Sequence, residues 1–275
     1  MTVSPLDHTA TGYSLAHAYG MGQAAGLAAL DRDGIEAQAH AWGFDQVRYF
    51  ESTHAMPFPI EDTQAYVMAS DRMIVTGFRG TEVAKIRDWL TDVDTPPVPG
   101  PGNKGFVHYG FDRALESVYA QVRDTILDMR GNGQTIWFTG HSLGAALAML
   151  AGARLYFEQP RLLADGIYTF GQPRTCDRLL AAAHNTAYAE RCYRFVNNND
   201  IVPQLPPEPA YTHVHALRYF DADGRLHEKM PLIATLQDRA KGVGADLFAP
   251  ETDAIKDHHL ANYLAAFKKS LATPA

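Results

Sequence analysis

Cysteine, basic clusters and long apolar runs are scarce in this chain, and each shortage excludes a class of protein. Two cysteines among 275 residues are too few for a disulfide scaffold. Lys and Arg number 24 against 31 Asp and Glu, without a basic cluster, so we expect no nucleic-acid partner. The most apolar window, Leu143 to Arg154, has about a dozen residues, well short of the roughly 20 that cross a bilayer. We therefore expect no transmembrane segment.

The N-terminal sequence MTVSPLDHTA also lacks the basic start and apolar stretch of a secretory signal. The expected location is therefore the cytoplasm or, for a protein whose signal has been removed, the cell exterior. What the chain does have is 46% hydrophobic residues, enough for the core of a large globular domain. We expect residues 1–275 to form one domain.

Short β-rich runs alternate with helical stretches along most of the chain. A helical N-terminal segment is predicted over residues 1–63, with one or two helices between residues 12 and 41. The predicted strands are 64–70, 72–78, 134–140, 166–171 and 191–197. Strands that alternate with helices indicate an α/β fold with a mostly parallel central sheet and helices on both faces.

The stretch WFTGHSLGAALAMLAG, residues 137–152, joins a predicted strand directly to a predicted helix. The GxSxG pattern at this join predicts a nucleophile elbow, a strained turn that lifts the side chain of Ser142 above the sheet. Gly140 and Gly144 remove side chains where strand and helix nearly touch. A serine that only caps a helix is the alternative. The strand before it and the helix after it favour a catalytic serine.

An acid and a histidine must accompany such a serine, because its hydroxyl is a weak nucleophile until a positioned base accepts the proton. On an elbow of this kind the order along the chain is serine, acid, histidine. Asp200 follows the predicted strand RCYRFVN and its polar turn, so it is the first candidate for the acid. Asp177 follows another strand more loosely and is predicted to cap the next helix, which makes it the second candidate.

The candidates for the base are the histidines that follow Asp200. His258 and His259 begin the last predicted helix, after a loop that can carry one of them over the edge of the sheet. The residues alone do not separate these two neighbours. His213 and His215 alternate in THVHALRYF at the spacing of a metal pair, but the sequence offers no third ligand, so no metal site is predicted.

Seven segments within about residues 64–265 form an ordered series of motifs. They are GFRGTE (77–82), GFVHYGFDRALESV (105–118), FTGHSLGAALA (138–148), TFGQPR (169–174), VNNNDIVPQLPP (196–207), YTHV (211–214) and DHHLANY (257–263). The series resembles the class 3 lipases, the fungal-lipase-like branch of the α/β-hydrolase superfamily. The resemblance implies an α/β-hydrolase fold and a serine carboxylic-ester hydrolase.

The resemblance also implies site residues. In the terminal motif of the family an aspartate precedes the histidine and a tyrosine follows five residues later, which matches His258 and not His259. The acid of the family corresponds to Asp200, and the oxyanion hole to the backbone N–H groups of Thr81 and Leu143. No metal or organic cofactor is implied.

Three positions near these motifs have no implied catalytic role. Cys176 in TFGQPRTCD departs from the family pattern, in which glycine is common, and it lies outside the implied triad. His108 and His213 match family motifs without a catalytic counterpart, so we expect both to be structural.

The segment EVAKIRDWLTDVDTPPVPG, which follows the oxyanion motif, predicts a short amphipathic helix before a Pro/Gly hinge. Its apolar residues recur at intervals of three and four, with Trp89 beside them. The resemblance implies that about residues 82–104 form a lid, with Trp89 as a substrate contact, whose apolar face turns toward lipid at an interface. A permanently docked helix is the alternative, and it would favour soluble esters.

The expected function is therefore that of a lipase. It would cleave acylglycerol-type lipid esters, at a lipid–water interface, through a Ser142–His258–Asp200 triad and an acyl-enzyme. One alternative is an esterase or acyltransferase for other acyl esters, such as phospholipids or feruloyl-type esters. Another is a non-catalytic hydrolase-like scaffold that binds a ligand. Acyl chain length and oligomeric state are not predicted by any pattern in the sequence.

Overall fold

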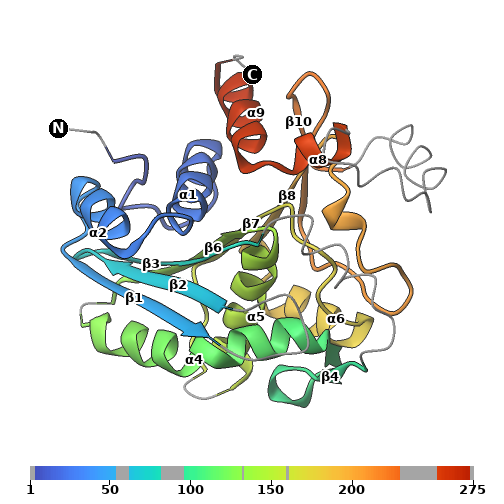
Figure 1. Ribbon diagram of the computed structural model, residues 1–275, viewed down its shortest axis with the longest axis horizontal. Helices are drawn as coiled ribbons and strands as arrows, with labels where there is room; N and C mark the ends of the chain where they lie inside the picture. Colours follow the sequence, from blue (N-terminus) through green and yellow to red (C-terminus); the bar gives the residue numbers. More distant parts are fainter. Residues whose placement is uncertain are drawn as a thin grey trace.

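An eight-stranded sheet lies at the centre of the protein (Figure 1). The computed structural model describes residues 4–53, 62–81, 96–131, 133–158, 161–229 and 253–272. The order across the sheet is β1-β2-β3-β6-β7-β8-β9-β10. In chain order these strands are β1 Gln46–Thr53, β2 Asp62–Ala69, β3 Met73–Phe78, β6 Thr135–His141, β7 Gly166–Phe170, β8 Cys192–Asn197, β9 Leu217–Phe220 and β10 Leu226–His227.

The central part of this sheet is parallel. Strands β3, β6, β7, β8 and β9 pair in parallel, whereas β1, β2 and β3 form an antiparallel edge and β10 returns antiparallel to β9. Strands β7 and β8 are buried along their whole length, as expected for parallel strands that are covered on both faces. The mostly parallel sheet predicted from the sequence is therefore confirmed.

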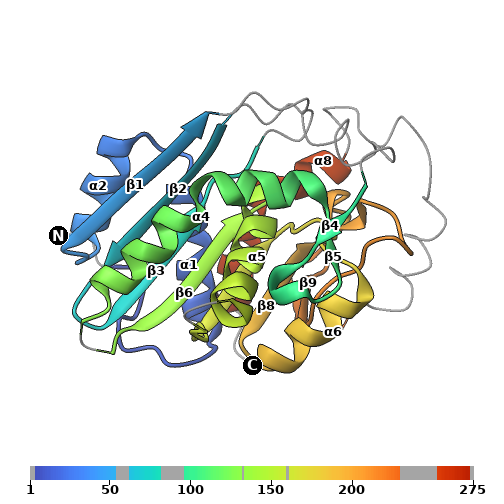
Figure 2. The ribbon, with the colours of Figure 1, turned by 90° about the horizontal axis from the view of Figure 1, so that it is seen from below.

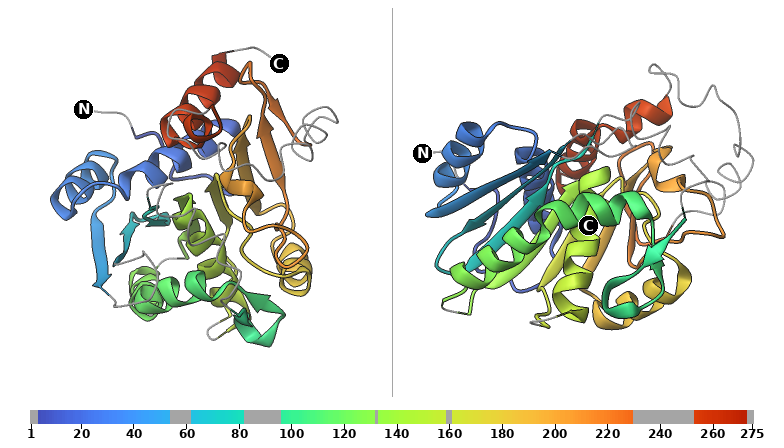
Figure 3. Two further views of the ribbon diagram at one scale, coloured as in Figure 1. Left: turned by 45° about the vertical axis from the view of Figure 1, so that its right-hand side comes forward. Right: turned by 60° about the horizontal axis from the view of Figure 1, so that its bottom comes forward.

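Helices cover both faces of the sheet (Figures 1 and 2). One face carries α4 Tyr109–Met129, α5 Leu143–Phe157 and α6 Arg178–Ala187; the other carries α1 Leu15–Leu27, α2 Arg32–Ala41 and α9 Leu260–Ala272. Figure 3 shows α1 and α9 side by side, and the two helices are in contact. The short helix α8 Asp253–His258 precedes α9 and lies beyond the carboxyl end of the sheet (Figure 1).

The two large hydrophobic cores of the described residues lie on opposite faces of the sheet, and a third, small cluster is formed by Ile201, Val202, Ala254 and Ile255. On one face α4 packs through a stripe of apolar residues spaced by three and four, from Phe111 to Met129, as expected for an amphipathic helix. Helix α5 is buried almost all round, so its alanines allow a close fit against the sheet. Both cysteines, Cys176 and Cys192, are buried free thiols in this core, and the fold therefore depends on packing and not on a disulfide.

The N-terminal segment is only partly helical, which corrects the prediction for residues 1–63. Helices α1 and α2 are present, but residues 46–53 form β1. The segment QVRYFEST escaped prediction because it is an edge strand. Val47 is its one buried residue, so the apolar alternation that marks a strand is weak.

The predicted lid falls mostly on residues that the structure does not describe. Residues 82–95, which include Trp89, lie outside the described ranges. The remainder, residues 96–104, contains the short strand β4 Val98–Pro99, which pairs with β5 Phe106–Val107, and one turn of 3-10 helix at Pro101–Asn103. Within the described parts of the chain, no helix is both long and apolar enough to span a membrane.

Candidate active site

Ser142 occupies a single-residue turn between β6, which ends at His141, and α5, which begins at Leu143. Its φ of 59° and ψ of −123° lie where a residue with a side chain is strained. A methyl group at Gly140 would collide with the carbonyl oxygen of Gly144, and one at Gly144 with the carbonyl oxygen of Phe78. The close approach of strand and helix therefore requires both glycines of the GxSxG pattern.

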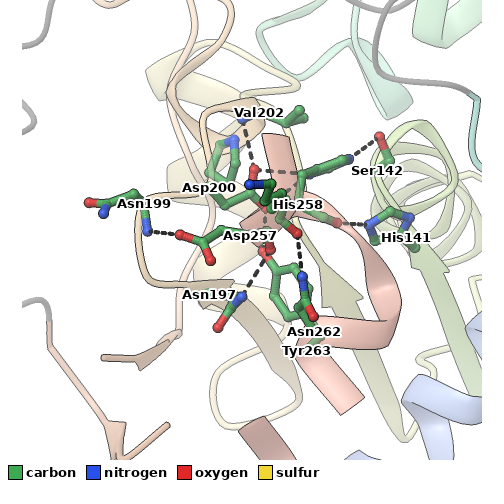
Figure 4. A network of polar contacts seen from close by, with 12 residues as sticks. His141, Ser142, Asn197, Asn199, Asp200, Val202, Asp257, His258, Asn262 and Tyr263 are labelled. Carbon is green, nitrogen blue, oxygen red and sulfur yellow. Dashed lines mark hydrogen bonds and ion pairs between the residues drawn. The ribbon is translucent and has the colours of Figure 1, made fainter. Parts of the chain in front are cut away.

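Three side chains from distant parts of the chain form a hydrogen-bonded series at this turn (Figure 4). The Oγ of Ser142 lies 2.8 Å from Nε2 of His258. Nδ1 of His258 lies 2.9 Å from each carboxylate oxygen of Asp200. The exposed fractions of the three residues are 0%, 0% and 2%. A hydroxyl that donates to Nε2 and an Nδ1–H that donates to a carboxylate are the contacts that activate a serine.

The carboxylate of Asp200 accepts further hydrogen bonds. The backbone N–H of Val202 donates to Oδ1 at 2.9 Å, and the hydroxyl of Tyr263 donates to Oδ2 at 2.5 Å. Burial raises the pKa of Tyr263 well above its usual value, and the charge of Asp200 raises it further, so the phenol keeps its proton. In the sequence this tyrosine is marked only by its spacing within the terminal motif, and the structure adds its contact with Asp200.

The loop of residues 197–202, called here the Asn loop, is tied to α8 by Asp257. The carboxylate of Asp257 accepts from Nδ2 of Asn198 at 2.9 Å and from the backbone N–H of Asn199 at 3.2 Å. The amide of Asn197 donates to the backbone oxygen of Asp257 at 2.9 Å. Burial raises the pKa of Asp257, although the Asn199 and Asn198 hydrogen bonds oppose this shift. These contacts hold Asp200 and His258 at a fixed separation, and sequence reasoning missed them.

Gly171 lies directly beside the imidazole of His258 and the carboxylate of Asp200. It has a φ of 61°, a left-handed conformation that glycine adopts without strain. A methyl group at this position would lie 2.8 Å from Cε1 of His258 and 2.9 Å from Oδ2 of Asp200. The glycine in TFGQPR therefore leaves room for the histidine and the acid to meet.

The predicted oxyanion residues lie around the same turn. Leu143 is buried and is the first residue of α5, so its backbone N–H has no acceptor within the helix. Thr81 is half-buried and follows Gly80, where a methyl group would lie 2.6 Å from the carbonyl oxygen of His141 and 3.5 Å from Cβ of Ser142. The segment that leads to Thr81 is thus packed against the turn. Trp89 lies outside the described residues.

The other candidates considered from the sequence lie apart from this series of contacts. Asp177, the second candidate for the acid, caps α6 as predicted, because its side chain accepts from the backbone N–H of Leu180 at 2.9 Å. The side chain of His259 is exposed. His108 caps α4, and Nε2 of His213 donates to the backbone oxygen of Pro203. No group of side chains suited to a metal ion occurs among the residues with described positions.

Comparison with known proteins assigns this region to a family. Residues 75–210, which include Ser142 and Asp200, match the family model described as lipase (class 3). This part of the chain belongs to the class 3 lipase family. The prediction made from the seven motifs is therefore confirmed.

Curated relatives agree with this membership. The lipase of Rhizomucor miehei is 37% identical to this chain over 165 residues, covering 57% of this chain and 44% of that protein. Triacylglycerol lipase OBL1 of Arabidopsis thaliana is 31% identical over 212 residues, covering 58% and 40%. The chain thus spans less than half the length of the curated relatives it matches.

Solved structures agree with the fold of the class 3 lipases. A triacylglycerol lipase described as having a serine protease triad at its catalytic centre superposes with a TM-score of 0.57 and 26% identity, covering 78% of each chain. Lipase II of Rhizopus niveus superposes with a TM-score of 0.61 and 24% identity, covering 90% of this chain and 94% of that one. The α/β-hydrolase fold expected from the sequence is confirmed.

Proposed function

We propose that the protein is a serine carboxylic-ester hydrolase that cleaves acylglycerol-type lipid esters. The observation that carries this proposal is the unbroken series of contacts from Ser142 through His258 to Asp200 at a strained strand-to-helix turn. A buried serine with a histidine at 2.8 Å and an acid behind that histidine has little structural purpose, because each polar group costs free energy to bury. It is well suited to acyl transfer.

The proposed reaction has two halves. In the first, His258 accepts the proton of Ser142 while the serine oxygen bonds to the ester carbonyl carbon, and the protonated histidine then gives this proton to the departing alcohol. In the second, water repeats the sequence on the acyl-enzyme and releases the carboxylic acid. Asp200 orients the imidazole and stabilises its positive form.

The oxyanion of each tetrahedral intermediate is proposed to bind the backbone N–H groups of Thr81 and Leu143. The N-terminus of α5 lies at the same place, and its partial positive charge favours a developing negative charge. Removing one donor of this kind typically costs about 10² to 10³ in turnover. Water is the second reactant, and the proposed nucleophile, base, acid and oxyanion donors all belong to the chain.

The substrate class is proposed from the relatives. Those described above are named lipase or triacylglycerol lipase, and they include a fungal and a plant protein. We accordingly propose that residues 82–104 act as a lid that opens at a lipid–water interface, with Trp89 in contact with the acyl chain.

A substrate series tests this function. The rate of hydrolysis is measured on p-nitrophenyl esters of increasing acyl length and on emulsified diacylglycerol and triacylglycerol. The expected result is a preference for medium or long chains and a rise in rate above the solubility limit of the ester. Activity confined to soluble short esters would favour the esterase alternative, and a folded protein inert to every ester would favour a binding scaffold.

Two serine variants make the series specific. Ser142→Ala is expected to fold and to lose about 10⁴-fold or more in turnover. Ser117→Ala is the matched control, because the Ser117 hydroxyl donates only to the backbone oxygen of Ala114, within α4. Survival of activity in Ser142→Ala would show that another residue is the nucleophile.

A further inference from the structure

The backbone of His258 has a contact that the proposed mechanism does not use. Helix α8 ends at His258 and α9 begins at Leu260. The backbone N–H groups of Asn262 and Tyr263 donate to the carbonyl oxygen of His259 and not to that of His258. The carbonyl of His258 thus lies at a break between helices, where it has no acceptor role in α9. Nε2 of His141 supplies a donor to this carbonyl at 2.7 Å (Figure 4).

This contact defines the hydrogen position on the imidazole of His141. A carbonyl oxygen can only accept, so Nε2 of His141 carries the hydrogen and the ring is its Nε2–H tautomer. The ring also lies against that of His258, with centroids 4.5 Å apart and planes at 35°. Burial lowers the pKa of His141 well below its usual value, and the proximity of His258 lowers it further, so the ring stays neutral.

The hydrogen bond from His141 to the carbonyl of His258 concerns the active site because His141 is the residue next to Ser142. His141 directly precedes Ser142, so a single residue connects the backbone of the turn to the backbone of His258. Asp200 fixes the imidazole of His258 through the side chain, at Nδ1. His141 fixes the same residue through the main chain, from the side of the serine. Both contacts together leave Nε2 little freedom to move away from Oγ.

We propose that His141 is a positioning residue, which holds the main chain of His258 so that its Nε2 stays within hydrogen-bond distance of Ser142. The proposal rests on the proposed ester hydrolase function. Its chemistry is a single donated hydrogen bond combined with ring contact, and His141 itself exchanges no proton with substrate. A displacement of about 1 Å between reacting groups can cost about 10²-fold in rate, so loss of this hydrogen bond should lower turnover measurably.

A matched pair of amide variants separates the hydrogen bond from other roles of the ring. In His141→Gln the amide nitrogen takes nearly the place of Nε2 and can still donate. In His141→Asn the same group is one methylene shorter and falls short of the carbonyl of His258. His141→Phe keeps the ring contact without the donor. The control is His259→Ala, which removes an exposed neighbour of His258.

The measured quantities are kcat and KM on a soluble p-nitrophenyl ester, with the melting temperature of each variant. We expect His141→Asn and His141→Phe to lower kcat by about 10- to 100-fold while KM changes less than about threefold. His141→Gln should recover to within about fivefold of the parent, and His259→Ala should stay within about twofold. Folded Asn and Phe variants with the parent kcat, or a Gln variant no better than Asn, would overturn the proposal.

A crystal structure of His141→Asn gives a readout that does not depend on activity. The expected result is a distance between Ser142 Oγ and His258 Nε2 beyond 3.5 Å or disorder of the imidazole, whereas His141→Gln keeps the contact. If the parent protein hydrolyses no ester, the proposed function fails while this distance still tests the positioning. An unchanged distance in His141→Asn would overturn the positioning role whatever the activity.

Discussion

The hydroxyl of Tyr263 and the imidazole of His258 donate to the same carboxylate oxygen of Asp200, at 2.5 Å and 2.9 Å. Tyr263 comes from the first turns of α9 and is fully buried. Since burial and the charge of Asp200 both keep the phenol protonated, it donates to the carboxylate throughout the neutral pH range. The carboxylate of Asp200 therefore accepts hydrogen bonds from Tyr263, from His258 and from the backbone N–H of Val202.

Tyr263→Phe removes that donor with little change of shape. Hydrogen bonds to charged groups contribute about 1.5 to 3 kcal/mol, so we expect the free energy of unfolding to fall by this amount. Turnover should fall by about tenfold, because Asp200 orients His258 less firmly. Urea unfolding and steady-state kinetics measure the two effects. A variant with unchanged stability and rate would show that the contact does not support Asp200.

Gly171→Ala tests the space beside the imidazole. The added methyl group would lie 2.8 Å from Cε1 of His258, and the φ of 61° is unfavourable for alanine. We expect the imidazole to be displaced and kcat to fall by about 10²-fold or more. Gly131→Ala is the control, because a methyl group there meets nothing within 4 Å. Parent-like kinetics in Gly171→Ala would contradict the close packing described here.

Asp257→Ala tests the connection between the Asn loop and α8. The variant loses both contacts of its carboxylate, with Asn198 and Asn199, so the Asn loop is held to α8 less firmly. We expect a loss in kcat of about tenfold, with part of it recovered in Asp257→Asn, whose amide oxygen can still accept. Asp253→Ala is the matched control, since its exposed carboxylate lies on the same helix and is 4.0 Å from Lys256. Equal effects of the two alanine variants would argue against this connection.

Because His184 is buried, we expect the free energy of unfolding to depend on pH. The histidine is buried on α6 and stacked on Tyr188, and neither ring nitrogen has a partner among the described residues. Burial lowers the pKa of His184 from 6.5 to about 3. Between these two values the unfolded chain binds a proton that the folded protein excludes, so stability falls as pH falls, by up to about 1.4 kcal/mol per pH unit.

His184→Phe should flatten this decline. Phenylalanine fills the same place without an ionisable group, so we expect the variant to match or exceed the parent in stability near pH 7 and to lose less of it toward pH 4. Melting temperatures between pH 7 and pH 4 measure the difference. Parallel curves for parent and variant would show that another group controls the loss at acid pH.

The main features of the site could be predicted because they are encoded locally. The strand, the GxSxG turn and the helix that positions Ser142 are consecutive, and Asp200 comes three residues after the end of β8. The alternation of strands and helices likewise predicts a parallel sheet. Local pattern also failed where it was weak, as in β1, an edge strand with one buried residue.

The contacts that support the site could not be predicted in this way. His141 and His258 are separated by 117 positions, and Tyr263 and Asp200 by 63, so no short-range pattern reports them. The choice between His258 and His259 depends on the break between α8 and α9, which apolar periodicity does not locate within one residue. Resemblance to the class 3 lipases was needed to separate these two histidines.

We propose that the hydroxyl of Ser142 is nucleophilic because His258 and Asp200 activate it. Peptide mass mapping after reaction of the folded protein with a fluorophosphonate tests this activation, with His258→Ala and heat-unfolded protein as comparisons. We expect one adduct, on Ser142, formed at least about 10³-fold more slowly in His258→Ala and absent after unfolding. A folded protein without an adduct on Ser142, or an adduct formed equally fast without His258, would contradict it.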